Sequence, residues 1–257
     1  MSSFKANVKK ATPESVLKLY RTIRYGNAPK LNPDKLRLID FALRQGARTF
    51  ADLGGMWRVN GGYSVYGADH GAKRVTLVDF HATPEFLAAQ GKRDNLAFLQ
   101  RNFALPETAC EVNEVDCVML FDVLLHQVKP DWHEVLKAYA PYAKRFLIFN
   151  QQFTGAHTVR LIEQGREWYL RHVPHAPDDT SEYQDLFEKA EQLHPRYTDG
   201  RTYRDMHDVW QWGITDLDLK RVLAELDFRV TYERDCGLWP GLEEIRNKAF
   251  VFERTDN

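Results

Sequence analysis

The chain has 257 residues, of which 36 are acidic and 35 basic, so its formal net charge is −1. Such a balance gives no global electrostatic reason to expect nucleic acid or an anionic membrane as a partner. Hydrophobic residues make up 44% of the sequence, which is ample for the core of one large domain or of one domain that carries an insertion.

Cysteine usage and hydropathy narrow the class of protein further. Cys110, Cys117 and Cys236 show no C-x-x-C spacing, which favours reduced thiols over disulfides or a zinc site. The first residues lack the apolar core of a signal peptide, and no apolar run approaches the ~20 residues of a membrane span. The sequence therefore predicts a cytoplasmic protein without a metal.

Two helices are expected in residues 1–47. Thr12-Pro13-Glu14 combines an N-cap residue, a proline at the first helical position and an acid in the first turn. Asn32-Pro33-Asp34 repeats this signal, and Gly46 ends the second helix. We expect this N-terminal segment to form a lid or a packing layer. Helical spacing places three apolar residues on one side of the second helix: Leu36, Ile39 and Leu43.

From Arg48 onward, short apolar runs alternate with helical patterns. This alternation predicts parallel βαβ units with helices on both faces of one sheet. The expected strands are 49–53, 74–78, 96–99, 116–121 and 145–149, and the expected helices are 63–71, 84–89 and 132–139.

The C-terminal part adds a helix and a hairpin. Thr215-Asp216 caps a helix that runs to Leu226, and residues 228–232 and 249–252 are expected to form two antiparallel strands. Together these patterns predict an α/β fold, with a doubly wound, mostly parallel sheet of about seven strands.

Residues 154–213 form a helical insertion after the fifth strand. Aromatic and histidine side chains are frequent in it, among them Trp168, Tyr203 and the pair His172 and His175, which is only a weak metal signal. We expect this segment to cap the carboxyl ends of the strands, where such folds bind their ligands. Its aromatic side chains either line an acceptor pocket or form a small core of their own.

Three features of a nucleotide-type site occur in the right order. A glycine-containing turn, Asp52–Gly55 and then Asn60–Gly62, follows the first strand and allows a close approach between backbone and ligand. Asp79 ends the second strand, where a carboxylate accepts hydrogen bonds from both hydroxyls of a ribose. An amide and an aromatic side chain, Asn102 and Phe103, follow the third strand and are suited to a purine.

The details of the turn distinguish between nucleotides. A dinucleotide fingerprint that starts at Gly54 requires glycines where this chain has Met56 and Val59. No phosphate-binding G-x-x-x-x-G-K-[ST] motif occurs, and Gly62–Tyr66 narrowly fails the pattern of a nucleophile elbow. A ligand with a ribose and an adenine but no phosphate therefore fits better than a dinucleotide.

Four segments resemble motifs of the class I S-adenosylmethionine-dependent methyltransferases. Phe50–Gly55 and Ala72–Asp79 resemble the first two motifs of the family, Asp116–His126 resembles its fourth-strand motif, and Phe146–Asn150 its fifth strand. The similarity runs from about residue 48 to the C-terminus and leaves out the insertion. It implies one methyltransferase-like domain over 48–257, with a cap at 154–213.

The resemblance also implies which residues bind S-adenosylmethionine. Gly54 would lie beneath the methionine part with Asp52 nearby, Asp79 would take the ribose, and Asn102 and Phe103 would hold the adenine. The usual Gly-x-Gly is Gly-Gly-Met here, and two further residues lengthen the turn. The full implied set, in which Phe121 borders the methionine amine, is Asp52, Gly54, Gly55, Gly62, Asp79, Phe80, Asn102, Phe103 and Phe121.

Candidate catalytic residues lie where an acceptor would approach the methyl group. They are His126 and Asp122 after the fourth strand and Asn150 at the end of the fifth, and each also has a structural interpretation. A general base must reach the acceptor proton within hydrogen-bond distance. Such a base is optional, because alignment alone supplies much of the rate of an in-line methyl transfer.

The resemblance thus implies an S-adenosylmethionine-dependent methyltransferase that acts on an oxygen or nitrogen of a small-molecule metabolite. The balanced charge argues against RNA or DNA as the acceptor. Two alternatives stay open: an NAD(P)-dependent oxidoreductase, and a non-catalytic partner protein that binds S-adenosylmethionine.

Overall fold

The computed structural model of the protein describes residues 30–173, 186–195, 197, 199–207 and 209–255. The helix predicted from Thr12 and the side chain of His175 lie outside these residues. Among the described helices, none combines the length and the apolar character that crossing a membrane requires.

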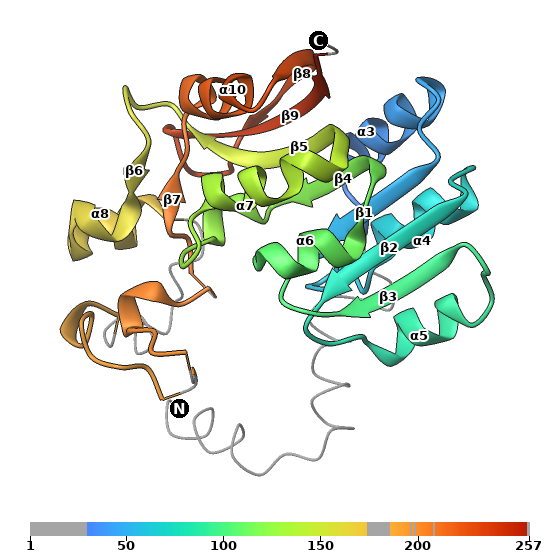
Figure 1. Ribbon diagram of the computed structural model, residues 1–257. Helices are drawn as coiled ribbons and strands as arrows, with labels where there is room; N and C mark the ends of the chain where they lie inside the picture. The colour runs from blue at the N-terminus through green and yellow to red at the C-terminus, as the bar shows by residue number, and fades with distance from the viewer. Residues whose placement is uncertain (1–29, 174–185, 196, 198, 208, 256–257) are drawn as a thin grey trace.

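The centre of the molecule is a seven-stranded sheet with the strand order β3-β2-β1-β4-β5-β9-β8 (Figure 1). Strands β1 to β5 are mutually parallel, and β9 pairs antiparallel with both β5 and β8. The predicted doubly wound sheet and C-terminal hairpin are confirmed. The strands are β1 (Thr49–Leu53), β2 (Arg74–Asp79), β3 (Leu96–Gln100), β4 (Val115–Phe121), β5 (Ala143–Phe153), β8 (Phe228–Leu238) and β9 (Ile245–Arg254).

Strand β5 is longer than its apolar run predicts. Its pairing with β9 continues from Phe149 through the polar residues 150–152 to Phe153. The reason is that an apolar run marks only the part of a strand that both helical layers bury. The carboxyl end of β5 consequently presents three consecutive amide side chains, all buried: Asn150, Gln151 and Gln152.

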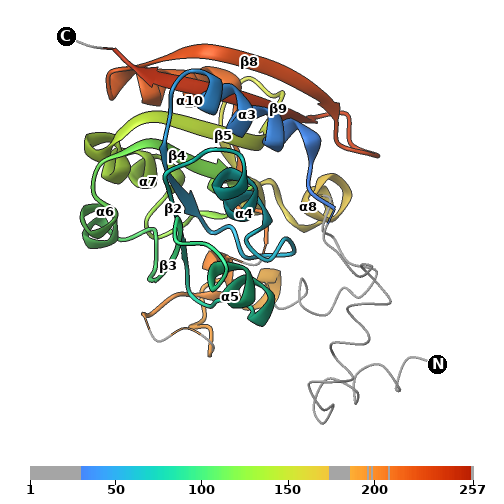
Figure 2. The same cartoon turned by 90° about the vertical axis from the view of Figure 1, so that its right-hand side faces the viewer.

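Helices cover both faces of the sheet. One apolar cluster lies under α6 (Pro106–Val112), α7 (Trp132–Tyr139) and α10 (Asp216–Glu225). The other lies under α3 (Pro33–Arg44), α4 (Gly62–Asp69) and α5 (Pro84–Gln90), and Figure 2 shows α3 and α4 on one side of the strands. The predicted N-cap residues of α3 and α10 are confirmed, since the side chains of Asn32 and Thr215 accept hydrogen bonds from the backbone of the first turn.

Two helices differ from the prediction. Helix α3 buries Lys35, Leu38, Ile39 and Ala42, whereas the predicted side with Leu36 and Leu43 is only partly buried. The buried side of the helix therefore keeps Ile39 but is shifted around the axis, away from Leu36 and Leu43 and toward Lys35, Leu38 and Ala42. Helix α6 was not predicted because its seven residues lack a clear apolar stripe, although its proline and acid at positions 106 and 107 are a helix-start signal.

The order of the strands places the crevice of the fold. The chain moves outward from β1 through β2 to β3 and returns to the other side of β1 with β4 and β5. In open α/β sheets, ligands bind outside the carboxyl ends of the strands where this reversal occurs. Here that position lies between the ends of β1 and β4, at Leu53 and Phe121.

The insertion after β5 contains helices, as predicted, and a two-stranded sheet that was not predicted. Its described elements are β6 (Val159–Arg160), α8 (Arg166–His172) and β7 (Trp212–Gly213), with 3-10 helices at Leu161–Gln164 and Tyr203–Asp205. Backbone groups of the segment after β4 bind it directly, since the amide of Gln211 donates to Leu125 and the Trp212 indole donates to Gln127. The insertion therefore lies beside the carboxyl end of β4, at the left of Figure 1.

Candidate cofactor and active site

The turn after β1 depends on two adjacent glycines. Gly54 has a φ of +73°, which favours glycine, and its amide donates to the carbonyl of Val78 at 2.9 Å. A Cβ on Gly55 would lie 2.3 Å from the Oδ2 atom of Asp52, so no larger residue fits there without movement. Both positions therefore require glycine, because a side chain at either would crowd Phe103, Val123 or Asp52. Gly62, also in the predicted set, is the first residue of α4.

Asp52 is a buried carboxylate directly behind this turn. Its Oδ2 atom accepts a hydrogen bond of 2.6 Å from the Ser64 hydroxyl, whereas its Oδ1 atom has no partner among the described residues. Burial raises the pKa of Asp52 to about 6, against the opposing effects of the Ser64 bond and the positive charge of Lys35. An unsatisfied buried carboxylate oxygen is costly, so it is a candidate contact for a ligand with hydrogen-bond donors.

Asp79 is the last residue of β2, and its carboxylate binds backbone amides of the turn after β1 and of the residue that follows Asp79. One carboxylate oxygen accepts the amide of Met56 at 3.0 Å and the other accepts the amide of Phe80 at 2.7 Å. Burial raises the pKa of Asp79, and these two backbone donors oppose the shift. The carboxylate is thus fixed in orientation at the end of its strand. Beside it, the ring of Phe80 is 49% exposed and available to a ligand.

The two residues after β3 have different environments. The Oδ1 atom of Asn102 accepts the amide of Ala104 at 3.0 Å. The Phe103 ring is 8% exposed and lies 3.1 Å from the position of a Cβ on Gly54, and the Phe103 carbonyl accepts the Tyr139 hydroxyl. Phe103 therefore supports the glycine turn from below, and its ring offers little surface to a purine.

The end of β4 carries a carboxylate that is held on both sides. Asp122 has a φ of +58°, a conformation that aspartate tolerates better than most residues, and its amide donates to Phe149. Its Oδ2 atom pairs with the ammonium of Lys35, and its Oδ1 atom accepts Nε2 of Gln151 at 2.8 Å. The Asp122 side chain is 38% exposed and directly follows β4, at the end of the strand where the fold places its crevice. Phe121, directly before it, is buried and meets the Tyr63 ring edge-on.

Lys35 is a residue of this site that the sequence analysis missed. It comes from α3, is only 6% exposed, and its ammonium lies 5.0 Å from the centre of the Phe149 ring and 5.3 Å from that of Tyr63. A signal for it was present in the sequence. Lys35 stands four residues before Ile39, and thus on the buried face of an amphipathic helix where a lysine is unusual.

The other two catalytic candidates, His126 and Asn150, have side chains that bond to the protein backbone. His126 lies in a 3-10 helix after β4, and its Nδ1 atom is 2.8 Å from the carbonyl of Val209 in the insertion. Asn150 is fully buried, donates to the carbonyl of Gln151, and its Oδ1 atom has no partner in the described part of the chain. Of the three candidates, Asp122 directly follows β4, and two side chains, those of Lys35 and Gln151, hold its carboxylate.

The aromatic residues of the insertion form a separate core. Tyr169 and Trp210 are buried, and the Tyr169 hydroxyl donates to the carbonyl of Trp210 at 2.8 Å. Trp168 and Tyr203 are partly buried against the same cluster, and Trp168 stacks on His172. These contacts favour the interpretation in which the aromatic side chains form a small core that stabilises the insertion, over the one in which they line an acceptor pocket.

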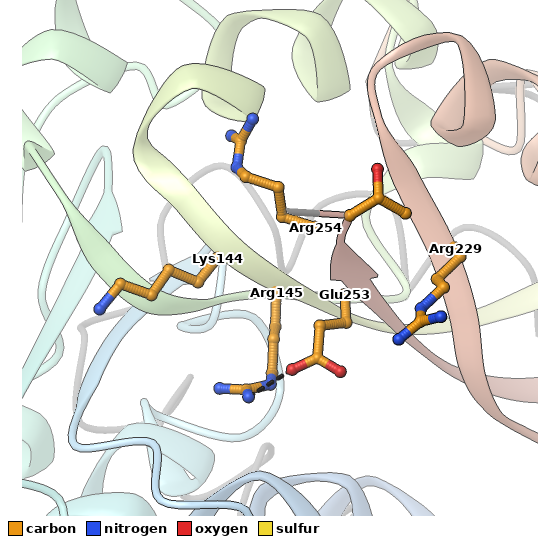
Figure 3. Close-up of a pocket in the computed structure, with 6 residues that line it drawn as sticks. Lys144, Arg145, Arg229, Glu253 and Arg254 are labelled. Atoms are coloured by element: carbon orange, nitrogen blue, oxygen red, sulfur yellow. Dashed lines mark hydrogen bonds and ion pairs between the residues drawn. The ribbon is translucent and has the colours of Figure 1, made fainter. Parts of the chain in front are cut away.

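A cavity of about 650 Å³ lies at the opposite end of the sheet, where β5 and β8 begin and β9 ends. No residue of the predicted site lines it. Arg145 pairs with Glu253, as Figure 3 shows, and Arg254 donates to the carbonyl of Ala143, so these two basic side chains are already engaged. The cavity is lined by Lys144, Arg145, Arg229, Glu253, Arg254 and Thr255. The described residues also contain no cluster of three or more His, Cys, Asp or Glu side chains that could hold a metal.

No protein-family model and no curated protein sequence matches the chain. Solved structures share its fold. The N-terminal domain of EvdMO1 with SAH bound is 13% identical, with a TM-score of 0.55 over 88% of this chain and 82% of that one. The 1,6-didemethyltoxoflavin-N1-methyltransferase from Burkholderia thailandensis, with 1,6-didemethyltoxoflavin and S-adenosylhomocysteine bound, is 14% identical, with a TM-score of 0.55 over 96% of this chain and 92% of that one.

A third structure, which aligns over nearly the whole chain, is the magnesium protoporphyrin IX methyltransferase from Synechocystis PCC 6803, also with SAH bound. It is 15% identical, with a TM-score of 0.52 over 98% of this chain and 100% of that chain. The fold of this protein is therefore the class I methyltransferase fold.

Proposed function

We propose that this protein is an S-adenosylmethionine-dependent methyltransferase that acts on an oxygen or nitrogen of a small molecule. The observation that carries the proposal is the pairing of a turn that requires glycine at positions 54 and 55 with a fixed carboxylate at Asp79, at the carboxyl ends of β1 and β2 in a methyltransferase fold. Structures with this fold that contain S-adenosylhomocysteine add support.

The residues present fit this cofactor. The backbone of the turn packs directly on the Asp52 carboxylate, since a Cβ on Gly55 would collide with it, and the buried Oδ1 atom of Asp52 has no hydrogen-bond partner among the described residues. We assign Asp79 to the ribose hydroxyls, Phe80 and Asn102 to the adenine side, and Gly54 to the methionine side. When bound, the cofactor supplies an electrophilic methyl group on a sulfonium. Met56 and Val59 in place of glycines oppose a dinucleotide in the same turn.

The chain's own contribution to the transfer is alignment. Asp122, held by Lys35 and Gln151, places a negative charge at the end of β4, beside the crevice. Fixed charges and fixed geometry cost no reorganisation during the reaction, and they account for much of the rate of such displacements. His126 and Asn150 stay candidates for contacts with the acceptor, His126 as its general base.

The first expected result concerns ligand choice. Calorimetric titration should show binding of S-adenosylhomocysteine in the micromolar range and no binding of NADH at the same concentrations. Release of S-adenosylhomocysteine from S-adenosylmethionine in the presence of a metabolite panel then separates an enzyme from a non-catalytic binding protein. Binding of NADH without any response to S-adenosylhomocysteine would refute the proposal.

The second expected result concerns the insertion. We propose that residues 154–213 determine the choice of acceptor and do not build the cofactor site. The Trp168 ring meets Phe153 at the end of β5 with the ring centres 6.3 Å apart, and thereby links the insertion core to the sheet. Trp168→Ala and Tyr203→Ala should change turnover or acceptor range but leave the affinity for S-adenosylhomocysteine within a few-fold. A large loss of that affinity in a folded variant would place the insertion in the cofactor pocket.

A further inference from the structure

A buried ammonium group lies under the proposed active site. The side chain of Lys35 is 8% exposed and passes between α3 and the carboxyl ends of β4 and β5. Its ammonium lies 5.0 to 6.0 Å from the ring centres of Phe149, Tyr63 and Phe121. Among the described residues, its ion-pair partner is Asp122, 87 positions away in the sequence.

Stability does not explain this lysine. A buried ion pair loses about as much in desolvation as it gains in attraction, and well-packed apolar side chains often replace such pairs without loss of stability. The neighbours of Lys35 on the buried face of α3 are Leu38, Ile39 and Ala42, and the rings around its ammonium form an apolar cage. A methionine or leucine would suit that position if packing were its purpose.

The pair instead fixes one carboxylate. Lys35 binds the Oδ2 atom of Asp122 and Gln151 binds the Oδ1 atom, while Gln151 itself donates to Asn247 at 3.1 Å. The backbone of Asp122 is in the left-handed region and is held by the carbonyl of Phe149. Among the described residues, the side chains that bond this carboxylate therefore come from α3 and β5, with β9 supporting Gln151 in turn, and the Asp122 side chain stays 38% exposed.

We propose that Lys35 is a positioning residue of the methyl-transfer site, which holds the carboxylate of Asp122 in the direction needed to contact the methionine end of the cofactor. This inference rests on the proposed function. Lys35 itself touches no ligand in this scheme. Its effect passes through Asp122, so the two residues act as one unit.

The test is a double-mutant cycle on S-adenosylhomocysteine binding, measured by calorimetry with Lys35→Met, Asp122→Asn and the double variant. Methionine fills the aromatic cage without a charge. We expect each single variant to weaken binding by roughly tenfold to a hundredfold, the range for one hydrogen bond to a charged group. The double variant should lose no more than Asp122→Asn alone, because the lysine has nothing left to position.

Three further variants complete the experiment. Arg37→Met on the exposed side of α3 is the matched control and should bind within twofold of wild type. Lys35→Arg should recover part of the lost affinity, because it restores a cation to Asp122. If Lys35→Met does not fold, Gln151→Leu removes the other support of the same carboxylate and should weaken binding in the same direction.

Two outcomes would overturn the inference while leaving the proposed function intact. One is a folded Lys35→Met variant that binds S-adenosylhomocysteine like wild type. The other is additive losses in the double variant, which would show that Lys35 acts independently of Asp122. Failure of the wild-type protein to bind S-adenosylhomocysteine would instead overturn the proposed function together with this inference.

Discussion

Replacement of Asp79 by alanine should weaken the binding of S-adenosylhomocysteine by about 2–4 kcal/mol. The reason is that the proposed site uses this carboxylate to accept two ribose hydroxyls, and hydrogen bonds to charged groups contribute about 1.5–3 kcal/mol each and are not additive. The backbone amides of Met56 and Phe80 already fix its direction, so no reorganisation offsets the gain. Calorimetric titration of the variant measures the loss directly.

The same substitution should change stability much less than affinity. The variant loses two backbone-to-carboxylate hydrogen bonds, but burial has raised the pKa of Asp79, which means that the fold destabilises the charged form that alanine removes. Asp69→Ala is a suitable control, since this exposed acid pairs with Arg93 at the end of α4, away from the crevice. Unchanged cofactor affinity in Asp79→Ala would show that β2 does not carry the ribose site.

Replacement of Asp52 by asparagine should stabilise the protein at neutral pH. The pKa of this carboxyl is about 6 in the folded state and 3.8 as the reference value, so folding favours its protonated form. A carboxyl with a raised pKa gives its full stability below the unfolded value and loses it as the pH rises through the folded value. At pH 7.5 the ionised group costs up to about 3 kcal/mol, and Asp52→Asn should recover a large part of that cost.

The pH dependence separates this effect from a simple change in packing. The stability difference between variant and wild type should fall to about half when the pH is lowered from 7.5 to 5, as urea unfolding can show. Asp116→Asn provides a control of opposite sign, because the bonds of Asp116 to Lys144 and to two backbone amides lower its pKa to about 2. Equal stability of Asp52→Asn and wild type at pH 7.5 would contradict the expectation.

The ionised carboxylate of Asp52 lowers the stability of the fold, yet the residue is buried at the end of β1. We infer that it has a functional purpose. Asp52 lies behind the turn proposed for the cofactor, and its Oδ1 atom, which has no partner in the described part of the chain, is an acceptor there. A ligand that donates to this oxygen would favour the ionised form. The affinity for S-adenosylhomocysteine should then rise between pH 5 and pH 7 in the wild-type protein and stay level in Asp52→Asn.

The sequence by itself determined the architecture of this protein. Alternating strand and helix patterns, the N-cap residues Asn32 and Thr215, and an acid at the end of β2 are local signals, because each depends on residues within a few positions of one another. The order of these signals predicts the sheet, its crevice, and the residues Gly54 and Asp79 beside that crevice. The structure confirms the sheet, and the ligand roles of these residues stay predictions.

The tertiary structure alone decided which side chains meet. Phe103, expected to hold a purine, packs under Gly54, and His126 binds the carbonyl of Val209 in the insertion. Helical spacing to Ile39 places Lys35 on the buried side of α3, but Asp122 becomes its partner, 87 positions away, only because α3 packs against β5 and β9. Such contacts depend on how elements that are distant in the sequence pack together, and no local pattern encodes that packing.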